Sequence, residues 1–343
     1  MRALTIQPAG DRGRLVLSDV PEPSPADGEL TVQAIALGIC GTDRELATRA
    51  PRSPAPGRSG LILGHESLGR VLTAPAGSEF NTGDLVVGIV RRPDPVPCMF
   101  CAKGQFDLCE NGRFTERGIS GADGFGSERF LLEMDYAVRV DPALGLAGVL
   151  LEPTSVVAKA WEQLDRLVRR PYRRALVLGS GPIGLLAALL AQQRGMDVHV
   201  VDRVEQGPKP RQAHALNAVY HTRVDELTGT FDAVVECSGA FVAEAIRLTA
   251  PGGATCLVGG VDPISAGSVN LGELSRELMV HNKVIFGTVN SNRRHFEAAH
   301  VALQKADRNW LEGLLTDCVP LEEWRSAFDV GPEAIKSVIR FES

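Results

Sequence analysis

Positive charge is not in excess in this sequence. Its 343 residues include 36 Lys and Arg against 42 Asp and Glu, which gives a formal net charge of −6 at pH 7. Proteins that bind a phosphate backbone concentrate Lys and Arg on one surface, whereas the arginine pairs here are separated along the chain. Charged residues make up 23% and hydrophobic residues 44% of the chain, as in ordinary globular proteins. The balance argues against nucleic acid as a partner and favours a small-molecule ligand.

A long hydrophobic run is absent as well. The longest apolar stretch without a charged residue, 175–191, is interrupted by three glycines and a proline. Such a stretch is typical of a strand, a loop and a helix in succession rather than of a membrane span. The first six residues lead directly into polar residues and lack the apolar core of a signal peptide. We therefore expect no membrane partner.

Cysteine is scarce and odd in number. The seven cysteines are Cys40, Cys98, Cys101, Cys109, Cys237, Cys256 and Cys318. Three of them fall within a dozen residues. In a chain that begins without a leader, this favours metal ligands or free thiols over disulfides. We predict a cytoplasmic protein.

Two patterns divide the chain, as its length predicts for two domains. Up to about residue 160, short apolar runs are separated by Gly, Pro, Asp and Asn, which indicates strands and turns. The later part alternates expected strands with expected helices, which predicts an α/β parallel sheet with right-handed crossovers. The expected elements are strands at 30–37, 85–90, 130–132, 137–140, 175–178, 197–201, 231–236, 254–258 and 284–288, and helices at 182–194, 241–249 and 276–282.

A glycine-rich turn opens the first of these helices. Gly179-Ser180-Gly181-Pro182-Ile183-Gly184 matches G-x-G-x-x-G after a strand, the setting that binds a dinucleotide pyrophosphate at a helix N-terminus. Asp202 ends the next strand, 18 residues beyond the last glycine. A carboxylate there accepts hydrogen bonds from ribose hydroxyls and repels a 2′-phosphate, which favours NAD over NADP. Arg203 beside it favours NADP instead, since a guanidinium can bind the 2′-phosphate.

A mixed set of metal-binding side chains precedes this domain. Cys40 is followed after 25 residues by His65 in Gly64-His65-Glu66. Zinc accepts thiolate, imidazole and carboxylate ligands together, and a catalytic zinc keeps one coordination position open. Each residue alone has an ordinary structural explanation, such as a buried core cysteine. The combination predicts a catalytic zinc.

A second candidate metal site consists of cysteines alone. Cys98 and Cys101 form a C-x-x-C pair and Cys109 follows, one thiolate short of a closed tetrahedral zinc. Pro95 occupies the position of a first ligand and cannot coordinate, whereas its neighbour Asp94 can. The alternatives are a structural zinc, a labile site with three sulfurs and a water, and a lobe without metal.

Read in order, the motifs resemble those of the zinc-dependent medium-chain dehydrogenase/reductase superfamily, and within it the glucose dehydrogenase branch, over nearly the whole chain. The motifs concerned are Cys40-Gly41-Thr42-Asp43-Arg44-Glu45, Gly64-His65-Glu66, Val90-Arg91-Arg92-Pro93, Glu116-Arg117-Gly118-Ile119, Leu151-Glu152-Pro153 with Lys159, the glycine turn, Glu236-Cys237-Ser238-Gly239, Asn282-Lys283, Gly287-Thr288-Val289-Asn290 and His295-Phe296-Glu297. The resemblance implies a GroES-like catalytic domain over 1–160, with a cysteine lobe near 91–112, and a doubly wound Rossmann domain over 161–292. It also implies that 293–343 returns to the catalytic domain.

The resemblance also implies a role for each site residue. Cys40, His65 and carboxylates drawn from Glu66 and Glu152 hold the catalytic zinc. The expected catalytic residues are Thr42, Glu66 and Glu45, with Thr42 passing the proton of the reacting hydroxyl to solvent through Glu45 or a ribose hydroxyl. The expected substrate residues are Glu116, Glu152 and Asn290. The expected cofactor residues are Gly179, Gly181, Pro182, Ile183, Gly184, Asp202, Arg203, Ser238 and Asn290.

The predicted reaction is hydride transfer from an aldose or a sugar-like secondary alcohol to NAD(P). One departure puts glucose in question: Val156 stands four residues after Glu152, where some sugar-oxidising relatives carry a polar residue. The alternative substrate is a cyclitol, an aminosugar or another secondary alcohol, and a remote alternative is a non-catalytic nucleotide-binding redox sensor. The resemblance further implies a homodimer or homotetramer formed through the sheet edge at 284–289.

Overall fold

Antiparallel strands build the first half of the structure, a computed structural model that describes residues 1–9, 12–48, 60–168, 170–171, 173–260 and 270–342. One sheet has the order β2-β1-β4, and a larger one has the order β11-β6-β5-β3-β19-β18 with β10 also paired to β3. The strands are β1 (Arg2–Ala9), β2 (Arg12–Asp19), β3 (Glu29–Ile39), β4 (Leu61–Ile62), β5 (Glu66–Thr73), β6 (Leu85–Gly88), β10 (Arg129–Glu133), β11 (Ala137–Val140), β18 (Asp317–Pro320) and β19 (Ser337–Arg340). Short helical segments complete this half: α1 (Gly41–Thr48), η3 (Met134–Tyr136) and η6 (Leu321–Ala327).

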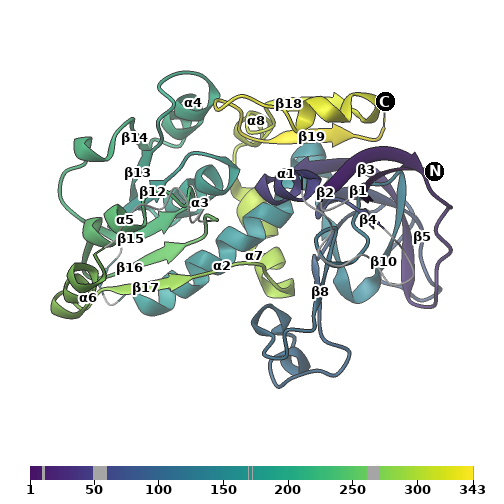
Figure 1. Cartoon of the computed structure of the whole chain (residues 1–343), viewed down its shortest axis with the longest axis horizontal. Coiled ribbons are helices and arrows are strands. Elements are labelled where there is room, and N and C mark those ends of the chain that lie inside the picture. Colours follow the sequence, from purple (N-terminus) through teal and green to yellow (C-terminus); the bar gives the residue numbers. More distant parts are fainter. Residues whose placement is uncertain (10–11, 49–59, 169, 172, 261–269, 343) are drawn as a thin grey trace.

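The C-terminal strands belong to the N-terminal sheet. β19 runs antiparallel to β3, with Ile339 opposite Leu37, and β18 pairs with β19. Figure 1 shows these yellow strands beside the purple N-terminal strands, with both chain ends on the same side. Residues more than 270 positions apart along the chain are thereby brought beside one another, which matters for the site below.

The cysteine lobe, residues 91–112, projects from the body of the molecule (Figure 1). It contains η1 (Cys101–Lys103) and η2 (Phe106–Leu108) and starts from a small sheet of β7 (Arg91–Arg92), β8 (Thr115–Arg117) and β9 (Gly121–Ala122). Three of the large exposed hydrophobic side chains lie on it: Val96, Met99 and Leu108.

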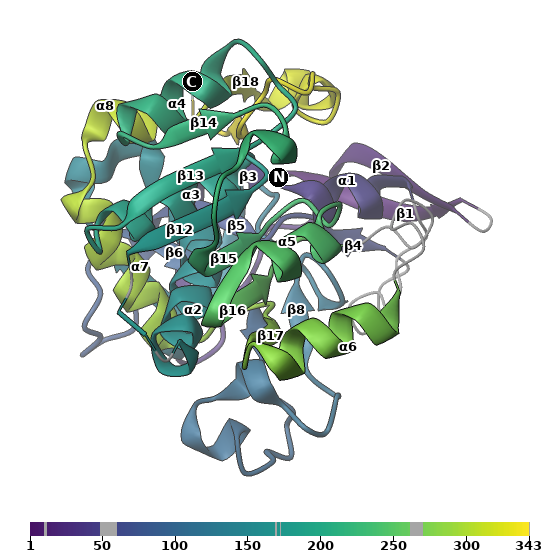
Figure 2. The ribbon, with the colours of Figure 1, turned by 90° about the vertical axis from the view of Figure 1, so that its left-hand side faces the viewer.

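A six-stranded parallel sheet forms the other half, in the order β14-β13-β12-β15-β16-β17. Its strands are β12 (Arg174–Leu178), β13 (Asp197–Val201), β14 (Val219–His221), β15 (Phe231–Glu236), β16 (Thr249–Leu257) and β17 (Val284–Gly287). The helices and 3-10 turn between them are α3 (Pro182–Gln192), α4 (Pro208–Ala215), η5 (Val224–Glu226), α5 (Val242–Leu248) and α6 (Leu271–Val280), and Figure 2 shows how they cover the sheet. The strands predicted at 197–201 and 231–236 are confirmed at those bounds, and β12 begins one residue early. A GroES-like β-rich unit and a Rossmann sheet are thus both present.

The helix between the two halves differs from the predicted pattern. Apolar runs predict β-rich structure up to about residue 160, but η4 (Pro142–Leu150) leads into the long helix α2 (Leu151–Leu167). Helix α2 packs against helix α3, strand β5 and strand β16, and its buried residues include the polar Glu152, Ser155 and Lys159, which interrupt the apolar stripe expected of a core helix. The domain limits at 160 and 292 therefore stay predictions.

The run Pro142–Leu167 is also the one helix in the described ranges that is long and apolar enough to cross a membrane. Its most apolar window is 78% buried inside the molecule. Helix α7 (Arg293–Lys305) packs along α2, and α8 (Arg308–Glu312) follows it. Trp161 of α2 is fully buried and its indole N–H donates to the Ala187 carbonyl of α3 at 3.2 Å. We conclude that α2 is the central core helix joining the two sheets.

Candidate active site

A cleft of about 860 Å³ lies between the two halves. The residues that line it come from α1, β5, β8, α2, the glycine turn and the segments 258–260, 288–290 and 335–336. Most of the predicted site residues meet here: Cys40, Thr42, Glu45, His65, Glu66, Glu116, Glu152, Gly181, Pro182, Ile183, Gly184 and Asn290. Val156 lines the same cleft, one helical turn beyond Glu152.

Cys40 and His65 face each other at the end of β3 and the start of β5. The His65 Nε2 atom lies 3.2 Å from the Cys40 Sγ atom. On the other side of the ring, Nδ1 lies 3.2 Å from a carboxylate oxygen of Asp43, which is fully buried. The second Asp43 oxygen accepts the Cys40 backbone N–H at 2.9 Å. Asp43 therefore fixes both donors, holding the imidazole so that Nε2 points to the sulfur.

Charge around the imidazole follows from this geometry. Burial disfavours a protonated His65, but the neighbouring Asp43 and Cys40 outweigh it and raise the pKa of His65 well above its ordinary value. The pKa of Asp43 is lowered, because the His65 ring outweighs the burial that would raise it. Asp43 was not among the predicted site residues. Its signal in the sequence was its place in the motif that begins at Cys40.

Glu66 has a partner that no sequence pattern predicts. Both of its oxygens accept hydrogen bonds from the Lys336 Nζ atom, at 2.8 and 2.5 Å, and both side chains are buried. Gly38 leaves the necessary room, since a Cβ at that position would lie 2.1 Å from a Glu66 oxygen. Lys336 comes from the segment before β19, 270 residues from Glu66, so no local pattern could have paired them.

Three of the four predicted zinc donors come together. Ligand atoms of Cys40, His65 and Glu66 all lie within 4.8 Å of one another, and the Glu152 carboxylate is not part of this group. Burial raises the pKa of Glu152 to about 7, with His65 opposing the rise and Glu66 adding to it. Two zinc ligands at roughly 2.0–2.3 Å from the metal lie about 3.5 Å apart, close to the sulfur–nitrogen distance here. The donor set therefore fits zinc.

Thr42 lies beside the sulfur at the mouth of this group. Its backbone N–H donates to the Cys40 Sγ atom at 3.2 Å, in the first turn of α1. Thr42 and Glu45 both line the cleft, and Glu45 is exposed to solvent. The two side chains thus lead from the metal donors toward solvent.

Glu116 and Asn290 form a pair on the opposite wall. The Asn290 side-chain amide donates to a Glu116 oxygen at 2.6 Å, and Arg91 donates to the same oxygen at 2.9 and 3.2 Å. Within the described chain, the second Glu116 oxygen accepts no hydrogen bond that the structure records. It is therefore available to a ligand hydroxyl. Asn290 has a backbone φ of +61°, a left-handed conformation that asparagine tolerates.

The glycine turn has the shape its motif predicts. Gly179 has a φ of +100°, and a Cβ at Gly184 would lie 1.8 Å from the Gly179 carbonyl oxygen. A Cβ at Gly181 would meet nothing within 4 Å, so the backbone there is open to a ligand. Gly181 precedes the N-terminus of α3, where free N–H groups favour an anion.

Asp202 is hydrogen-bonded to this turn. One of its oxygens accepts the Ser180 backbone N–H at 2.8 Å and lies 3.6 Å from the Lys209 Nζ atom. The other accepts the Val204 N–H at 3.1 Å. Arg203 is exposed beside it. Because Lys209 balances the carboxylate, Asp202 repels a phosphate less than an unpaired acid would.

The remaining cofactor prediction, Ser238, lies on the loop after β15. Its hydroxyl and N–H both donate to Glu236, at 2.5 and 3.1 Å, and Gly239 donates to the other Glu236 oxygen. Glu236 is fully buried and so fixes this loop. Asp202, Arg203, Gly179 and Ser238 do not line the cleft itself, whereas Cys237 does.

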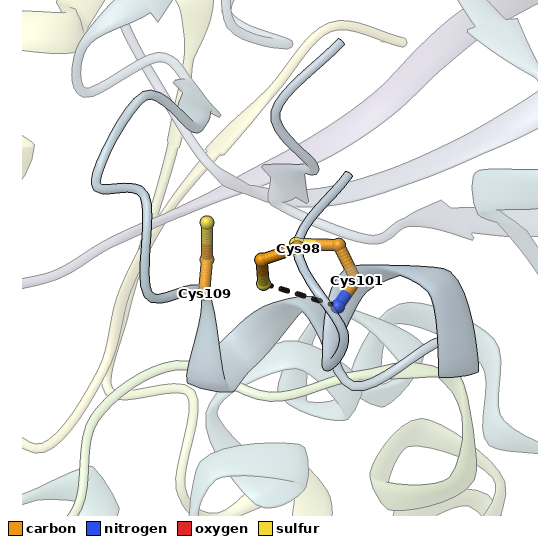
Figure 3. A group of neighbouring side chains, drawn as sticks. All are labelled: Cys98, Cys101 and Cys109. Carbon is orange, nitrogen blue, oxygen red and sulfur yellow. Dashed lines mark hydrogen bonds between the residues drawn. The ribbon is translucent and has the colours of Figure 1, made fainter. Parts of the chain in front are cut away.

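The cysteine lobe gathers its three thiols, as Figure 3 shows. The ligand atoms of Cys98, Cys101 and Cys109 lie within 4.8 Å of one another. The backbone N–H of Cys101 donates to the Cys98 sulfur at 3.5 Å. Asp94 is not a member of this group, because its oxygens accept the Val96 N–H at 2.8 Å and pair with Arg113 at 2.9 Å.

Comparison with known proteins identifies the family. The profile of the alcohol dehydrogenase GroES-like domain matches residues 26–142, and that of the glucose dehydrogenase C-terminus matches residues 145–341. A glucose 1-dehydrogenase of Methanocella arvoryzae is 37% identical, with 99% of each chain covered, and one of Thermoproteus tenax is 35% identical over the whole of both. A glucose dehydrogenase of Haloferax mediterranei, solved in complex with NADP, Zn and gluconolactone, is 32% identical over 100% of both chains with a TM-score of 0.90. The chain belongs to the glucose dehydrogenase branch of the zinc-dependent medium-chain dehydrogenase/reductase superfamily, a group of NAD(P)-dependent oxidoreductases.

Proposed function

We propose that this chain oxidises a glucose-like aldose, or a closely related sugar-like secondary alcohol, with NAD(P) as the hydride acceptor. The observation that carries the proposal is the single cleft that unites the Cys40 and His65 donors, the Glu152 carboxylate, the open backbone at Gly181 and the Glu116–Asn290 pair. The names of the relatives, glucose 1-dehydrogenase in each case, support an aldose as substrate.

Cys40 and His65 are the donors we assign to a catalytic zinc. Since Lys336 holds both oxygens of Glu66, we assign the exchangeable carboxylate position to Glu152 across the cleft. Zinc in this donor set would supply Lewis acidity, which lowers the pKa of the reacting hydroxyl toward neutral pH. Metal content of Glu66→Gln and Glu152→Gln variants tests the assignment, with the larger loss of zinc expected for Glu152→Gln.

Thr42 is the residue we assign to the proton. Its position beside the Cys40 sulfur allows its hydroxyl to accept the proton of the substrate hydroxyl and to donate its own to solvent. Glu45 on the solvent side of the same helix is the next acceptor. Thr42→Val should lower kcat strongly, whereas Glu45→Gln should lower it less, because solvent can take the proton in place of Glu45.

Glu116 and Asn290 are the residues we assign to the remaining sugar hydroxyls. One Glu116 oxygen is held by Arg91 and Asn290, which orients the other toward the cleft. A site built to hydrogen-bond hydroxyl groups strongly rejects analogues that lack them, because its own polar groups are then left unpaired. Monodeoxy sugars should therefore be poor substrates.

The sugar panel also decides between substrate classes. Val156 presents an apolar side chain to the cleft close to Glu152 and offers no hydrogen bond to a sugar hydroxyl there, so a cyclitol, an aminosugar or another secondary alcohol is the alternative to an aldose. The experiment measures reduction of NAD and of NADP with aldoses, cyclitols, aminosugars and simple secondary alcohols. Oxidation of aldoses with the highest kcat/KM supports the proposal, and activity confined to simple alcohols would refute it.

The preference between NAD and NADP rests on the end of β13. The sequence predicts NAD from Asp202, but the Haloferax relative binds NADP, and Asp202 here is balanced by Lys209. We propose that Arg203 and Lys209 admit the 2′-phosphate, so that the chain uses NADP as well as NAD. The ratio of kcat/KM for the two cofactors should shift toward NAD in Arg203→Ala.

For the assembly we propose a homodimer. In the described ranges β17 is an edge strand of the parallel sheet, and near it Met279 and Val280 are 75% and 53% exposed. An open strand edge beside apolar side chains is a ready surface for a second copy. Light scattering should give twice the chain mass, and Ile285→Lys in β17 should reduce it to that of one chain.

A further inference from the structure

A closed ring of hydrogen bonds and ion pairs lies behind the substrate wall of the cleft, the wall that carries Glu116 and Asn290. It joins the cysteine lobe to α2 and to the segment after β17. Its members are Asp107, Arg91, Glu116, Asn290, Val289 and Lys159. Only Glu116, Val289 and Asn290 line the cleft. The other three act on the substrate wall from behind it.

Asp107 is the residue at which the ring closes. Its side chain is 1% exposed, and one oxygen lies 2.8 Å from the Lys159 Nζ atom. Lys159 in turn donates to the Val289 carbonyl at 3.1 Å, next to Asn290. In the other direction the Asp107 backbone carbonyl accepts from Arg91 at 3.2 Å, and Arg91 holds Glu116.

Asp107 makes a second contact with the segment after β17. Its other oxygen accepts the side-chain amide of Asn292 at 2.6 Å. Asn292 caps helix α7, so this contact fixes the point where the segment 288–291 ends. Burial would raise the pKa of Asp107, but Lys159 and Asn292 hold it below the ordinary value. The carboxylate thus stays charged and able to hold all its donors.

The lobe carries this carboxylate between two of its cysteines. Asp107 lies on η2, and Cys101 and Cys109 flank it in sequence. The three gathered thiols and Asp107 therefore belong to one short structural unit. The fold places that unit against the substrate wall by way of Arg91, Lys159 and Asn292.

We propose that Asp107 is a positioning residue for the substrate: through Arg91, Lys159 and Asn292 it sets the geometry of the Glu116–Asn290 pair, so that the cysteine lobe controls sugar recognition. This inference rests on the proposed function for the identity of the substrate. If the lobe had a purely structural role, substitutions in it would change stability without changing which sugar hydroxyls the enzyme requires.

The main variant is Asp107→Asn, which keeps the size of the side chain and removes its charge. The matched control is Asp94→Asn, a buried carboxylate of the same lobe that pairs with Arg113 and is not part of the ring. Since Asp107→Asn leaves Lys159 buried without a counter-charge, the double variant Asp107→Asn/Lys159→Met serves if the single one does not fold. Each is assayed with a set of monodeoxy derivatives of the best sugar.

In Asp107→Asn, kcat/KM for the sugar should fall about 10- to 100-fold, chiefly through KM, as expected for loss of a charge-assisted hydrogen bond. The KM for NAD(P) should change by less than about twofold, and discrimination against the most strongly rejected deoxy sugar should weaken. The double variant Asp107→Asn/Glu116→Gln should lose little more kcat/KM than Glu116→Gln alone, because Asp107 acts through the Glu116 carboxylate. Asp94→Asn should leave the sugar KM unchanged. Additive losses, or an equal KM change in Asp94→Asn, would overturn the proposal.

A substrate-free measurement separates this inference from the proposed function. Deuterium exchange of the segment 288–292 should be faster in Asp107→Asn than in the wild type, and unchanged in Asp94→Asn. If the wild type oxidises no aldose, the proposed function fails while the exchange result still decides whether Asp107 holds the segment. If the wild type oxidises an aldose but exchange and deoxy-sugar discrimination are unaffected in Asp107→Asn, the proposed function stands and the inference fails.

Discussion

The cleft and the cysteine lobe each bring three metal-binding side chains within 4.8 Å, but they are built differently. In the cleft the donors are a thiol, an imidazole and a carboxylate from separate parts of the fold, and buried charged residues hold them. In the lobe all three donors are thiols from twelve consecutive residues. Mixed donors with an open side suit catalysis, whereas sulfur donors close in sequence suit a structural or labile site.

The surroundings of the two groups differ as much as the donors. Asp43 behind His65 and Lys336 behind Glu66 are 0% and 1% exposed. The lobe has a buried ion pair of its own, Asp107 with Lys159, on the side of the substrate wall, but its other pair joins buried Asp94 to Arg113, whose side chain is 66% exposed. Charges are worth more when water is excluded, so the cleft donors depend on their charged partners far more than the lobe depends on the Asp94–Arg113 pair.

The largest effect that separates the two groups should be on turnover. His65→Ala removes a donor from the cleft, and loss of several kcal/mol of charge stabilisation should lower kcat/KM by at least about a thousandfold. Cys101→Ser in the lobe should lower it by less than about tenfold, since Cys101 acts on the substrate only indirectly, through the placement of Asp107. Steady-state kinetics with metal analysis of both variants measures the difference. Equal losses would abolish the distinction between a catalytic and a supporting site.

The next effect should be on stability. Lys336→Met leaves Glu66 buried without a counter-charge, which should cost about 3–5 kcal/mol of the free energy of unfolding. Arg113→Met breaks the largely exposed pair of the lobe and should cost less than about 1 kcal/mol. Lys336→Arg keeps the charge and controls for its loss. Urea denaturation followed by circular dichroism compares the three variants, and similar costs for Lys336→Met and Arg113→Met would contradict the burial argument.

The comparison also explains what could be predicted from sequence. Local features were predictable: strands β13 and β15, the glycine turn and the three lobe cysteines each depend on short-range pattern. The strands on both sides of the turn predicted the Rossmann sheet, because alternating strands and helices of that length leave few other topologies. The ligand types of Cys40, His65 and Glu66 predicted a zinc site, but adding Glu152 required the family resemblance, since nothing in its spacing places the start of α2 near the end of β3.

What could not be predicted depends on tertiary pairing. Lys336 reaches Glu66 only because β19 pairs with β3, and Asp107 reaches Lys159 only because the lobe folds back on α2. Helix α2 escaped prediction for a related reason: its buried face carries the polar residues Glu152, Ser155 and Lys159, whose partners come from distant segments and which interrupt the expected apolar stripe. The suggestion that Asp94 completes the lobe failed because Val96 and Arg113 occupy its oxygens.

The rate of metal release should also differ between the cleft and the lobe. The cleft imidazole has a buried carboxylate behind it, a partner whose loss typically lowers metal affinity about 10- to 100-fold, and the lobe thiols have no such carboxylate among the contacts described. A chelator should therefore remove lobe metal first, in a fast phase that Cys98→Ser abolishes. A metal-sensitive dye follows the release. A single slow phase in the wild type would mean that the lobe binds metal as tightly as the cleft or holds none, and total metal per chain distinguishes these.

The smallest effect concerns the thiols themselves. Backbone N–H groups of Cys101 and Glu110 point at the Cys98 sulfur and lower its pKa to about 7, whereas burial raises the pKa of the Cys318 thiol above 9.0. At pH 7 about half of Cys98 would be thiolate, against roughly 1% of an ordinary thiol, which is a gain of about fiftyfold in the reactive form. A more acidic thiol gives a less nucleophilic thiolate, and this lowers the gain in rate by about tenfold.

In metal-free protein, alkylation of Cys98 by iodoacetamide at pH 7 should thus be at least about fivefold faster than that of Cys318, and the difference should shrink as the pH rises toward 9. Peptide mass spectrometry measures both sites in one sample, with Cys318 as the internal control. Zinc added beforehand should protect Cys98 and leave Cys318 unchanged if the lobe binds it. A Cys98 that reacts only above pH 9 would show that the lobe thiols are ordinary, and that the lobe differs from the cleft in the type of its donors alone.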